Sequence, residues 1–578
     1  MKRNGILVQK KYLEYLSSTM AFTLSIYIAS IVDGLLVGRL IGPGAFTAIN
    51  LTMPVVCIKN ILFCLFISGG SVLVSQFMGA RRFDDCTQTF TLSLAGGVAF
   101  SMVLAIIGIS VSGRLADLLD KSGTFAGDVY SYLVPLWALW PLTMLTSGTA
   151  SFMRLEGQHG LAAAIPIFAN VINLLCDIVF IRFFGWGING AGWATVTGYG
   201  AAVVLLLPYL RSKTRRLHFV RPSQDILKRL VNILKVGLPI SLIDACDMLR
   251  IYTINSTMIA LLGNIGGQVI AVCTAAKLYA IMLANGAATA MTNVVGALYG
   301  EQDRNGVLHV LKISLCIASA TCIAVFILLE LFPVQFAGFY RATNPELLEV
   351  LVPWLRIYSL VILVIGPLYI LRAFYQSTGQ VNAATALSVL EGAGFMIPIF
   401  YLLSKISVNA MACANLFSAA LAIIAVSFWM HLKAKKQGLD NFLMLRSSMI
   451  HKSWEASIAC TEQEAVKASQ ALLEYCQQNS ISSRVANAVS ISAEELCVNI
   501  TRFSGLRPDE QIDLLFKVFD DSVVLKVRDS GKLFNPTEYM DDGKLITGLK
   551  LIRAIATKIE YSVILGFNTT VLTVKSKL

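Results

Sequence analysis

Twelve long apolar stretches constrain the fold of this 578-residue chain more than any other feature of its sequence. Each holds about 20 or more mostly apolar residues, which is enough for a helix to cross the hydrocarbon core of a bilayer. A backbone in lipid must satisfy its own hydrogen bonds, so these stretches predict transmembrane helices. They lie near residues 13–40, 48–76, 90–112, 129–153, 162–184, 190–210, 233–261, 268–299, 309–332, 349–376, 383–403 and 408–432.

The distribution of charge predicts membrane topology rather than nucleic-acid binding. The net charge is +12, but from Ser447 onward 15 Lys and Arg residues accompany 16 Asp and Glu residues, so the surplus belongs to the apolar part. With both termini placed in the cytoplasm, the inner loops hold 18 Lys and Arg residues and the outer loops hold five. By the positive-inside rule we expect a multi-pass plasma-membrane protein with both termini cytoplasmic and no nucleic-acid partner.

The first six stretches and the last six look like copies of each other. Gly42 precedes Gly263 by 221 residues, Gly79 precedes Gly300 by 221, and FMRLEGQ at 152–158 precedes FYQSTGQ at 374–380 by 222. We therefore expect two pseudo-symmetric six-helix lobes, residues 1–222 and 223–440. Such repeats are typical of transporters that rock one half against the other. Two stacked copies without transport would explain the repeat, but not the acidic residues inside it.

The first lobe carries acidic and amide side chains within apolar sequence. Asp177 follows Asn173 by one helical turn, Thr195 lies at similar depth in the next stretch, and Asp33 interrupts the first stretch. An ionisable group at mid-membrane costs ~2.5–3.5 kcal/mol, whereas a hydrogen bond between membrane helices contributes only ~0.6 kcal/mol on average. Helix–helix adhesion therefore does not account for the carboxylates. Oxygen ligands from three stretches suit a bound cation or a transferred proton, so we expect H⁺ or Na⁺ to couple here.

The second lobe also carries charges within its apolar stretches. Asp244, Asp247 and Arg250 follow one another at intervals of three, which places them along one helical face. Asp247 can neutralise Arg250 directly, so a structural ion pair and a coupling or substrate site are both open interpretations. The further charges of this lobe are Lys277, Arg372 and Glu391. Together they make the lobe more polar than a cavity for apolar cations requires.

The membrane part resembles the multidrug and toxic compound extrusion family of twelve-helix antiporters. The resemblance covers about residues 10–435 and rests on VDGLLVGRLIG, SQFMGARR, MRLEGQ and NVINLLCDIVFI followed by GINGAGWAT. It implies export of small molecules such as organic cations. It also implies a cation site at the matching positions, Asp33, Asn173, Asp177 and Thr195.

Residues 447–578 alternate charged and apolar residues, as a globular α/β sandwich domain does. About 130 residues suffice for one hydrophobic core. The pattern predicts strands near 454–458, 511–519, 522–529, 558–565 and 569–575. It predicts helices at 462–478, 482–502 and 548–557.

Three ordered motifs in this domain carry a second resemblance. E-x-x-x-N appears at Glu495 and Asn499, D-x-G-x-x-F-N-P begins at Asp529, and TGLKLI at 547–552 opens a helix. They resemble the ATP-binding fold of histidine kinases, heat-shock-90-type ATPases and, most closely, anti-sigma-factor serine kinases.

This second resemblance implies ATP and Mg²⁺ as cofactors. Asn499 would hold Mg²⁺, and Glu495 would act as the catalytic base that polarises a water or serine hydroxyl. Asp529 would accept a hydrogen bond from the adenine amino group, and Gly531 would let the backbone approach the adenine ring. Gly548 and its helix N-terminus would meet phosphate. Lys550 stands where the family has a second glycine, which favours nucleotide binding over kinase activity. A degenerate module that binds no nucleotide is the third alternative.

The main hypothesis is an H⁺- or Na⁺-coupled exporter of small organic compounds, regulated by a cytoplasmic ATP-binding domain. The sequence has no GxxxxGK[ST] loop, so transport is expected to be driven by an ion gradient. One alternative is a lipid-linked precursor flippase, which the charged second lobe favours. Another is a membrane-anchored serine kinase acting on a small cytoplasmic anti-anti-sigma-like protein.

Overall fold

The computed structural model divides the chain into two compact units. The sheet unit combines Met1–Leu13, Gln302–His309 and Arg446–Leu578, and the membrane unit combines Glu14–Glu301 and Val310–Leu445. The structure describes residues 3–41, 48–49, 51–120, 125–212, 215–221, 225–340, 344–439, 442–445, 452–519, 521–533, 535, 540–541, 544–545 and 547–575. Among these, it does not describe the side chains of 26, 28–40, 244, 248, 255, 259, 264, 540–541, 544–545, 547–549 and 551.

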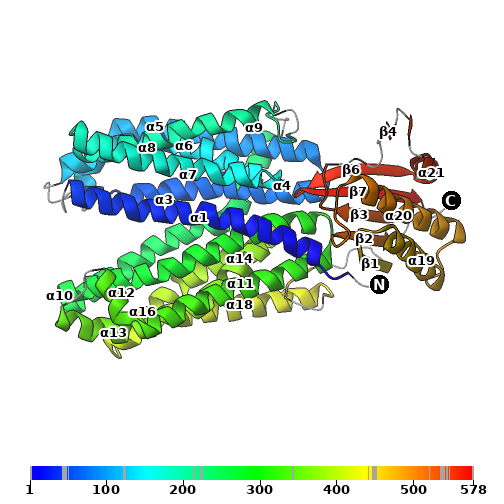
Figure 1. Ribbon diagram of the computed structural model, residues 1–578. Helices are drawn as coiled ribbons and strands as arrows, with labels where there is room; N and C mark the ends of the chain where they lie inside the picture. Colours follow the sequence, from blue (N-terminus) through cyan, green and yellow to red (C-terminus); the bar gives the residue numbers. More distant parts are fainter. Residues whose placement is uncertain are drawn as a thin grey trace. The chain divides into compact units, whose positions relative to one another are not determined.

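The N-terminal half of the membrane unit is helical (Figure 1). Its buried core is centred on large side chains, among them Phe90, Trp140 and Phe152. The helices are α1 (Ile6–Leu40), α3 (Met53–Phe63), the π-helical turn η1 (Cys64–Ser68), α4 (Gly69–Gly79), α5 (Phe83–Leu119), α6 (Ala126–Leu155), α7 (His159–Asp177), the π-helical turn η2 (Ile178–Phe183), α8 (Gly187–Ala202), the 3₁₀ turn η3 (Val203–Leu206) and α9 (Leu207–Arg211).

The C-terminal half is also helical and has a separate core that includes Trp354, Tyr358 and Phe400. α10 (Ile226–Gly300) is two helices that meet at Gly263, whose φ of 59° and ψ of −139° suit only glycine. The others are α11 (Arg304–Leu331), α12 (Pro333–Phe339), α13 (Pro345–Ser359), α14 (Ile362–Ser377), α15 (Val381–Val389), the π-helical turn η4 (Leu390–Gly394), α16 (Met396–Ser404), α17 (Val408–Met411) and α18 (Ala414–Lys436).

Nine helical segments among the described residues are long and apolar enough to cross a membrane. They are Met53–Gly79, Phe83–Leu119, His159–Phe183, Gly187–Arg211, Ile265–Gly300, Arg304–Leu331, Pro345–Ser377, Val381–Ser404 and Val408–Lys436. Helices α1, α6 and the first part of α10 cover the other three predicted stretches. The helical membrane fold is thus confirmed, and the number of twelve spans stays a prediction.

Two glycines that the sequence repeat pairs lie at one helix crossing. A Cβ atom on Gly79 of α4 would overlap the Ala297 carbonyl oxygen of α10, and one on Gly300 of α10 would overlap the Gln76 carbonyl oxygen of α4. Each glycine therefore lets its helix approach the backbone of the other. The two glycines that the sequence pairs at an offset of 221 residues thus share one packing role.

The C-terminal part of the sheet unit forms a five-stranded antiparallel sheet of order β1-β2-β3-β7-β6. Leu565 and Gly566, with φ of 56° and 76°, form the tight turn between β6 and β7. The strands are β1 (Lys452–Ala459), β2 (Gln511–Val518), β3 (Ser522–Asp529), β6 (Lys558–Ile564) and β7 (Phe567–Lys575), with a short separate hairpin of β4 (Met540–Asp541) and β5 (Lys544–Leu545).

Helices α19 (Glu462–Gln478), α20 (Ser483–Phe503) and α21 (Thr547–Ile555) complete the sandwich (Figure 1). Alternate strand residues such as Leu514, Phe516 and Leu525 share a core with Leu472 of α19 and Leu496 of α20. The helices therefore cover one face of the sheet. The predicted order of strands and helices is confirmed, with bounds shifted by at most a few residues.

Candidate functional site

The buried acid of the first lobe lies at the C-terminal end of α7. Asn173 Nδ2 donates a hydrogen bond of 2.8 Å to Asp177 Oδ2, and both side chains are buried. Helical spacing of four places them on one face. The α-helix gives way to the π-helical turn η2 directly after Asp177, and such turns occur often at functional sites. The structure thus brings together two of the four predicted coupling residues.

Helix α8 packs closely against this part of α7. A Cβ atom on Gly198 would overlap the Ala169 carbonyl oxygen and lie 3.0 Å from the backbone nitrogen of Asn173. Thr195, on the same helix, is partly buried, and its hydroxyl donates to the Ala191 carbonyl oxygen at 3.2 Å. Asp33 belongs to α1, but its side chain lies outside the described residues.

The second lobe gathers charged side chains around one carboxylate. Glu391, in the π-helical turn η4, is 3.0 Å from Arg250 Nη1, 3.4 Å from Arg372 Nη2 and 3.9 Å from Lys277 Nζ. Arg250 also forms an ion pair with Asp247. The predicted pairing of Asp247 with Arg250 is confirmed, and Glu391 contacts both lysine and arginine. The side chain of Asp244, which the sequence analysis placed on the same helical face as Asp247 and Arg250, lies outside the described residues.

In the sheet unit, the predicted adenine-binding carboxylate is held by two donors. Asp529, at the end of β3, accepts 2.8 Å hydrogen bonds on Oδ1 from the Gly531 amide and from Asn568 Nδ2. Burial raises the pKa of Asp529 to about 6, although both hydrogen bonds oppose the shift. Asn568 in turn accepts a 2.7 Å hydrogen bond from the Tyr561 hydroxyl. Asn568 belongs to none of the motifs identified from the sequence. An Asn within a strand of β-branched residues would have been the signal for it.

Helix α20 supplies the residues predicted to serve Mg²⁺ and catalysis. Asn499 is buried, and its Nδ2 has no hydrogen-bond partner within the described residues, as suits a group that awaits a ligand. Glu495, one turn earlier, is partly buried. A Cβ atom on Gly531 would lie 2.7 Å from Ser504, so this glycine is needed for contact with the end of α20.

The predicted phosphate-binding residues lie on α21. Gly548 is in its first turn, but its surroundings are outside the described residues, and Lys550 is exposed. Two features of the structure, the buried Asn499 amide and the two-donor cradle of Asp529, fit an adenine nucleotide with Mg²⁺. Asn499, Asp529 and Gly531 would hold this group, and the bound metal would neutralise phosphate charge.

The other face of the sheet carries buried charges that the sequence analysis did not predict as a site. Arg3 contacts Asp303 at 2.7 Å and Asp513 of β2 at 2.9 Å, and Arg528 of β3 contacts Asp303 at 3.4 Å. Burial raises the pKa of Asp303, but the guanidinium groups of Arg3 and Arg528 outweigh it and hold that pKa well below its usual range. Because the partners lie 300 and 510 residues apart in sequence, no local pattern reveals them.

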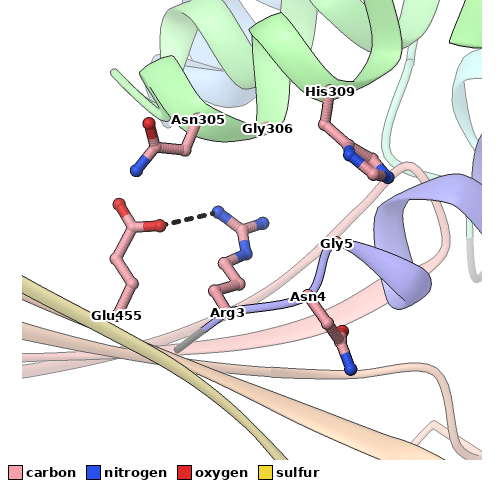
Figure 2. A pocket seen from close by; sticks show the side chains of 7 residues that line it. All are labelled: Arg3, Asn4, Gly5, Asn305, Gly306, His309 and Glu455. Carbon is pink, nitrogen blue, oxygen red and sulfur yellow. Dashed lines mark hydrogen bonds and ion pairs between the residues drawn. The ribbon is translucent and has the colours of Figure 1, made fainter. Parts of the chain in front are cut away.

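A pocket of about 270 Å³ lies beside Arg3 (Figure 2). Figure 2 places Asn305 and Glu455 on one side of the Arg3 side chain and His309 on the other, with a 3.4 Å contact from Arg3 to Glu455. The backbone N–H of Asn4 donates to the Ser457 hydroxyl of β1, and Lys517 Nζ donates to the Gln302 carbonyl oxygen. Residues 3–4 and 302–309 are thus integral parts of the sheet unit.

Comparison with known proteins assigns both parts of the chain. The pattern of the MatE family matches residues 19–179 and 245–402. The pattern of the histidine kinase-like ATPase domain matches residues 459–574. The first match covers more than half of the chain and the second covers nearly the whole sandwich.

Curated relatives are bacterial export proteins. The chain is 26% identical to the multidrug export protein MepA of Staphylococcus saprophyticus. The match covers 37% of this chain and about half (48%) of that protein. It is 21% identical to MepA of Staphylococcus aureus (strain MSSA476) over 75% of this chain and 96% of the relative.

Solved structures share the fold of the membrane part. A multidrug resistance MATE family transporter of the MOP superfamily in an outward-facing conformation superposes with a TM-score of 0.67 and 21% identity, over 76% of this chain and 100% of the other. A MOP superfamily transporter from Pyrococcus furiosus is described as having a binding pocket of reverse polarity that suggests a different function. It superposes with a TM-score of 0.67 and 21% identity, over 75% of this chain and 99% of the other.

Proposed function

Because the chain belongs to the MatE family, we propose that it exports small organic molecules in exchange for an inward flow of H⁺ or Na⁺. The relatives in Staphylococcus are named as multidrug export proteins, which supports export as the direction. The observation that carries the proposal is the buried Asn173–Asp177 pair in the apolar helix α7.

An exchanger needs a group that holds the ion in one state of its cycle and releases it in another. Asp177 is fully buried and accepts a hydrogen bond from Asn173. Its ionised form is therefore favourable only beside a bound cation, and a proton makes the group neutral. Asp33 and Thr195 are the proposed further oxygen ligands. In this scheme Asp177 takes up H⁺ or Na⁺ from outside, and the bound ion changes which conformation of the lobe is stable.

The test is the substitution Asp177→Asn in proteoliposomes that hold the full-length protein. The introduced Asn has the size of Asp177 and can keep a hydrogen bond to Asn173. It cannot ionise, so it cannot balance the charge of a cation. We expect dye efflux driven by a pH or Na⁺ gradient to fall at least about tenfold, which corresponds to a loss of roughly 1.4 kcal/mol. Comparing the two gradients identifies the ion.

The matched control is Asp117→Asn, the same substitution at an exposed position of α5. It should leave efflux unchanged. Full gradient-driven efflux by the Asp177→Asn protein would refute the coupling role of this pair.

The sandwich domain is proposed to bind ATP and to regulate export. β3 carries Asp529 toward the helices and Arg528 toward the opposite face, because neighbouring strand residues point to opposite sides. Arg528 contacts Asp303, which also contacts Arg3. A shift of β3 when nucleotide binds at Asp529 would therefore alter the surroundings of Asp303 and Arg3 directly.

The chain itself supplies the connection to the transporter. The segment 302–309 includes the first residues of α11. The N-terminal segment includes the first residues of α1, the helix that bears Asp33. This continuity supports regulation of transport by the domain over an independent kinase activity. Glu495 as a catalytic base, and a phosphorylated anti-anti-sigma-like partner, stay predictions.

A further inference from the structure

Among the described residues, the charge cluster of the second lobe holds three cations and two carboxylates. Arg250, Lys277 and Arg372 are each at most 6% exposed and share Glu391, which is 7% exposed. Asp247 adds a second carboxylate but contacts Arg250 alone among these cations. Among the side chains that the structure describes, three positive and two negative groups meet here, a formal surplus of one positive charge.

Arg372 has a hydrogen-bond partner within the described residues for one of its three donor nitrogens. Its Nη2 is 3.4 Å from Glu391, while Nε and Nη1 have no hydrogen-bond partner within the described residues. Its guanidinium also lies 5.1 Å from the centre of the Tyr369 ring. A buried guanidinium with two unsatisfied nitrogens is costly, and buried polar groups of native proteins are rarely left so.

Lys277 is held only loosely by the cluster. Its ammonium is 3.9 Å from Glu391, which is beyond hydrogen-bonding distance. Arg250 lies 13 residues before the break at Gly263, and Lys277 lies 14 residues after it. The two helices of α10 thus carry these cations at similar distances from the break. An ion-pair network that served packing alone would be expected to satisfy each buried cation, because an incompletely paired buried charge destabilises the fold.

The position of Glu391 is itself unusual. It lies in a π-helical turn, and Ser418 of α18 donates a 2.7 Å hydrogen bond to its carbonyl oxygen. The turn therefore has a specific partner that holds it. Side chains from both parts of α10 and from α14 converge at this carboxylate.

We propose that Arg372, Lys277 and Arg250 form the binding site for the anionic group of an amphiphilic organic substrate. A carboxylate or phosphate oxygen matches the planar donors of Arg372 and the ammonium of Lys277. The surrounding apolar helices would receive the apolar body of the same molecule. This inference rests on the proposed export function and names its substrate class. The ligand is an organic anion, either water-soluble or the phosphate headgroup of a lipid.

The experiment compares three fluorescent probes on the full-length protein. These are carboxyfluorescein, a phosphatidylglycerol with a fluorescent acyl chain, and ethidium as the cation. Equilibrium binding is measured by fluorescence polarisation in detergent, and gradient-driven transport is measured in proteoliposomes. We expect one of the anions to bind and to move, and binding of ethidium to be much weaker. Which anion binds distinguishes a soluble substrate from a lipid headgroup.

Substitutions locate the anion. Arg372→Gln and Lys277→Gln should each weaken anion binding about tenfold or more, as expected for loss of a charge-assisted hydrogen bond, and Arg372→Lys should restore part of it. Arg356→Gln is the matched control, because Arg356 is an exposed arginine of α13 that contacts Glu330. It should leave binding unchanged.

Two results would overturn the inference. One is ethidium export along a gradient without binding of either anion, a result that leaves the export function intact. The other is anion binding unaffected by both cluster substitutions. The probe preference of the wild-type protein decides the matter even if a variant fails to fold. By contrast, gradient-independent movement of every probe would contradict the export function itself.

Discussion

At the scale of single residues, Asp529 links the environment of the nucleotide site to pH. Its carboxylate is buried between β3 and α20, and burial raises its pKa to about 6. Asn568 and the Gly531 amide each donate to Oδ1 and lower the pKa. The proposed contact with an adenine amino group needs the ionised carboxylate as a strong acceptor. Protonation below pH 6 removes this form.

We therefore expect nucleotide affinity to fall as the pH is lowered from 8 to 5, with a midpoint near the pKa of about 6. Asn568→Ala should move that midpoint to higher pH, because it removes a donor that favours the ionised form. Isothermal titration of the full-length protein with ATP measures both curves. The phosphates of ATP titrate equally in the wild-type and Asn568→Ala curves, so a difference between the two midpoints reports on Asp529. An unchanged midpoint would contradict the assigned role.

At the scale of elements, the contact between α7 and α8 fixes the proposed ion site. Gly198 lets α8 lie against the backbone of α7 at Ala169 and Asn173. Asn173 in turn holds Asp177. The sequence places these residues on apolar helices, but it does not say which glycine makes the close contact.

Gly198→Ala should push the two helices apart. The added Cβ atom would overlap Ala169 and approach Asn173, which we expect to cost about 1–3 kcal/mol and to lower gradient-driven efflux. Gly200→Ala on the same helix is the control, since its Cβ atom would meet nothing within 4 Å. Thermal unfolding and efflux of the two variants are compared side by side. Equal behaviour would mean that the α7–α8 contact tolerates the methyl group.

At the scale of the whole molecule, the sheet unit is assembled from three separate parts of the chain. Arg3 and Asp303 come from segments that continue into transporter helices, while Asp513 and Arg528 come from the sandwich. All four side chains are buried. Removing one partner of such a network leaves charges buried without compensation, a loss of about 3–5 kcal/mol.

Asp303→Asn should therefore uncouple export from ATP. We expect nucleotide binding to persist while the effect of ATP on transport in proteoliposomes is lost. Lys517→Met, which removes the donor to the Gln302 carbonyl oxygen, is a milder second variant. The control is Lys10→Gln, because the half-exposed Lys10–Glu510 pair contributes at most about 1 kcal/mol. If transport by the Asp303→Asn protein responded to ATP as fully as the wild type, this network would be excluded as the link between nucleotide binding and transport.

The sequence was informative wherever the determining pattern is local. Long apolar runs predicted membrane helices because lipid leaves the backbone no other partner. Strand alternation and helical periodicity predicted the sandwich from Lys452 to Lys575, including both long helices, because burial of one face imposes a period on each element. The ordered motifs around Asn499 and Asp529 predicted the ATPase-like fold, which the family comparison confirms.

Tertiary structure alone decided which distant charges meet. The sequence established that Glu391, Lys277 and Arg372 are charged groups in apolar stretches. It did not establish that one carboxylate serves three cations, or that Arg3 belongs to the same unit as a sheet 510 residues away. Ionic contacts between distant segments depend on how the chain folds back on itself, and no short-range period encodes that.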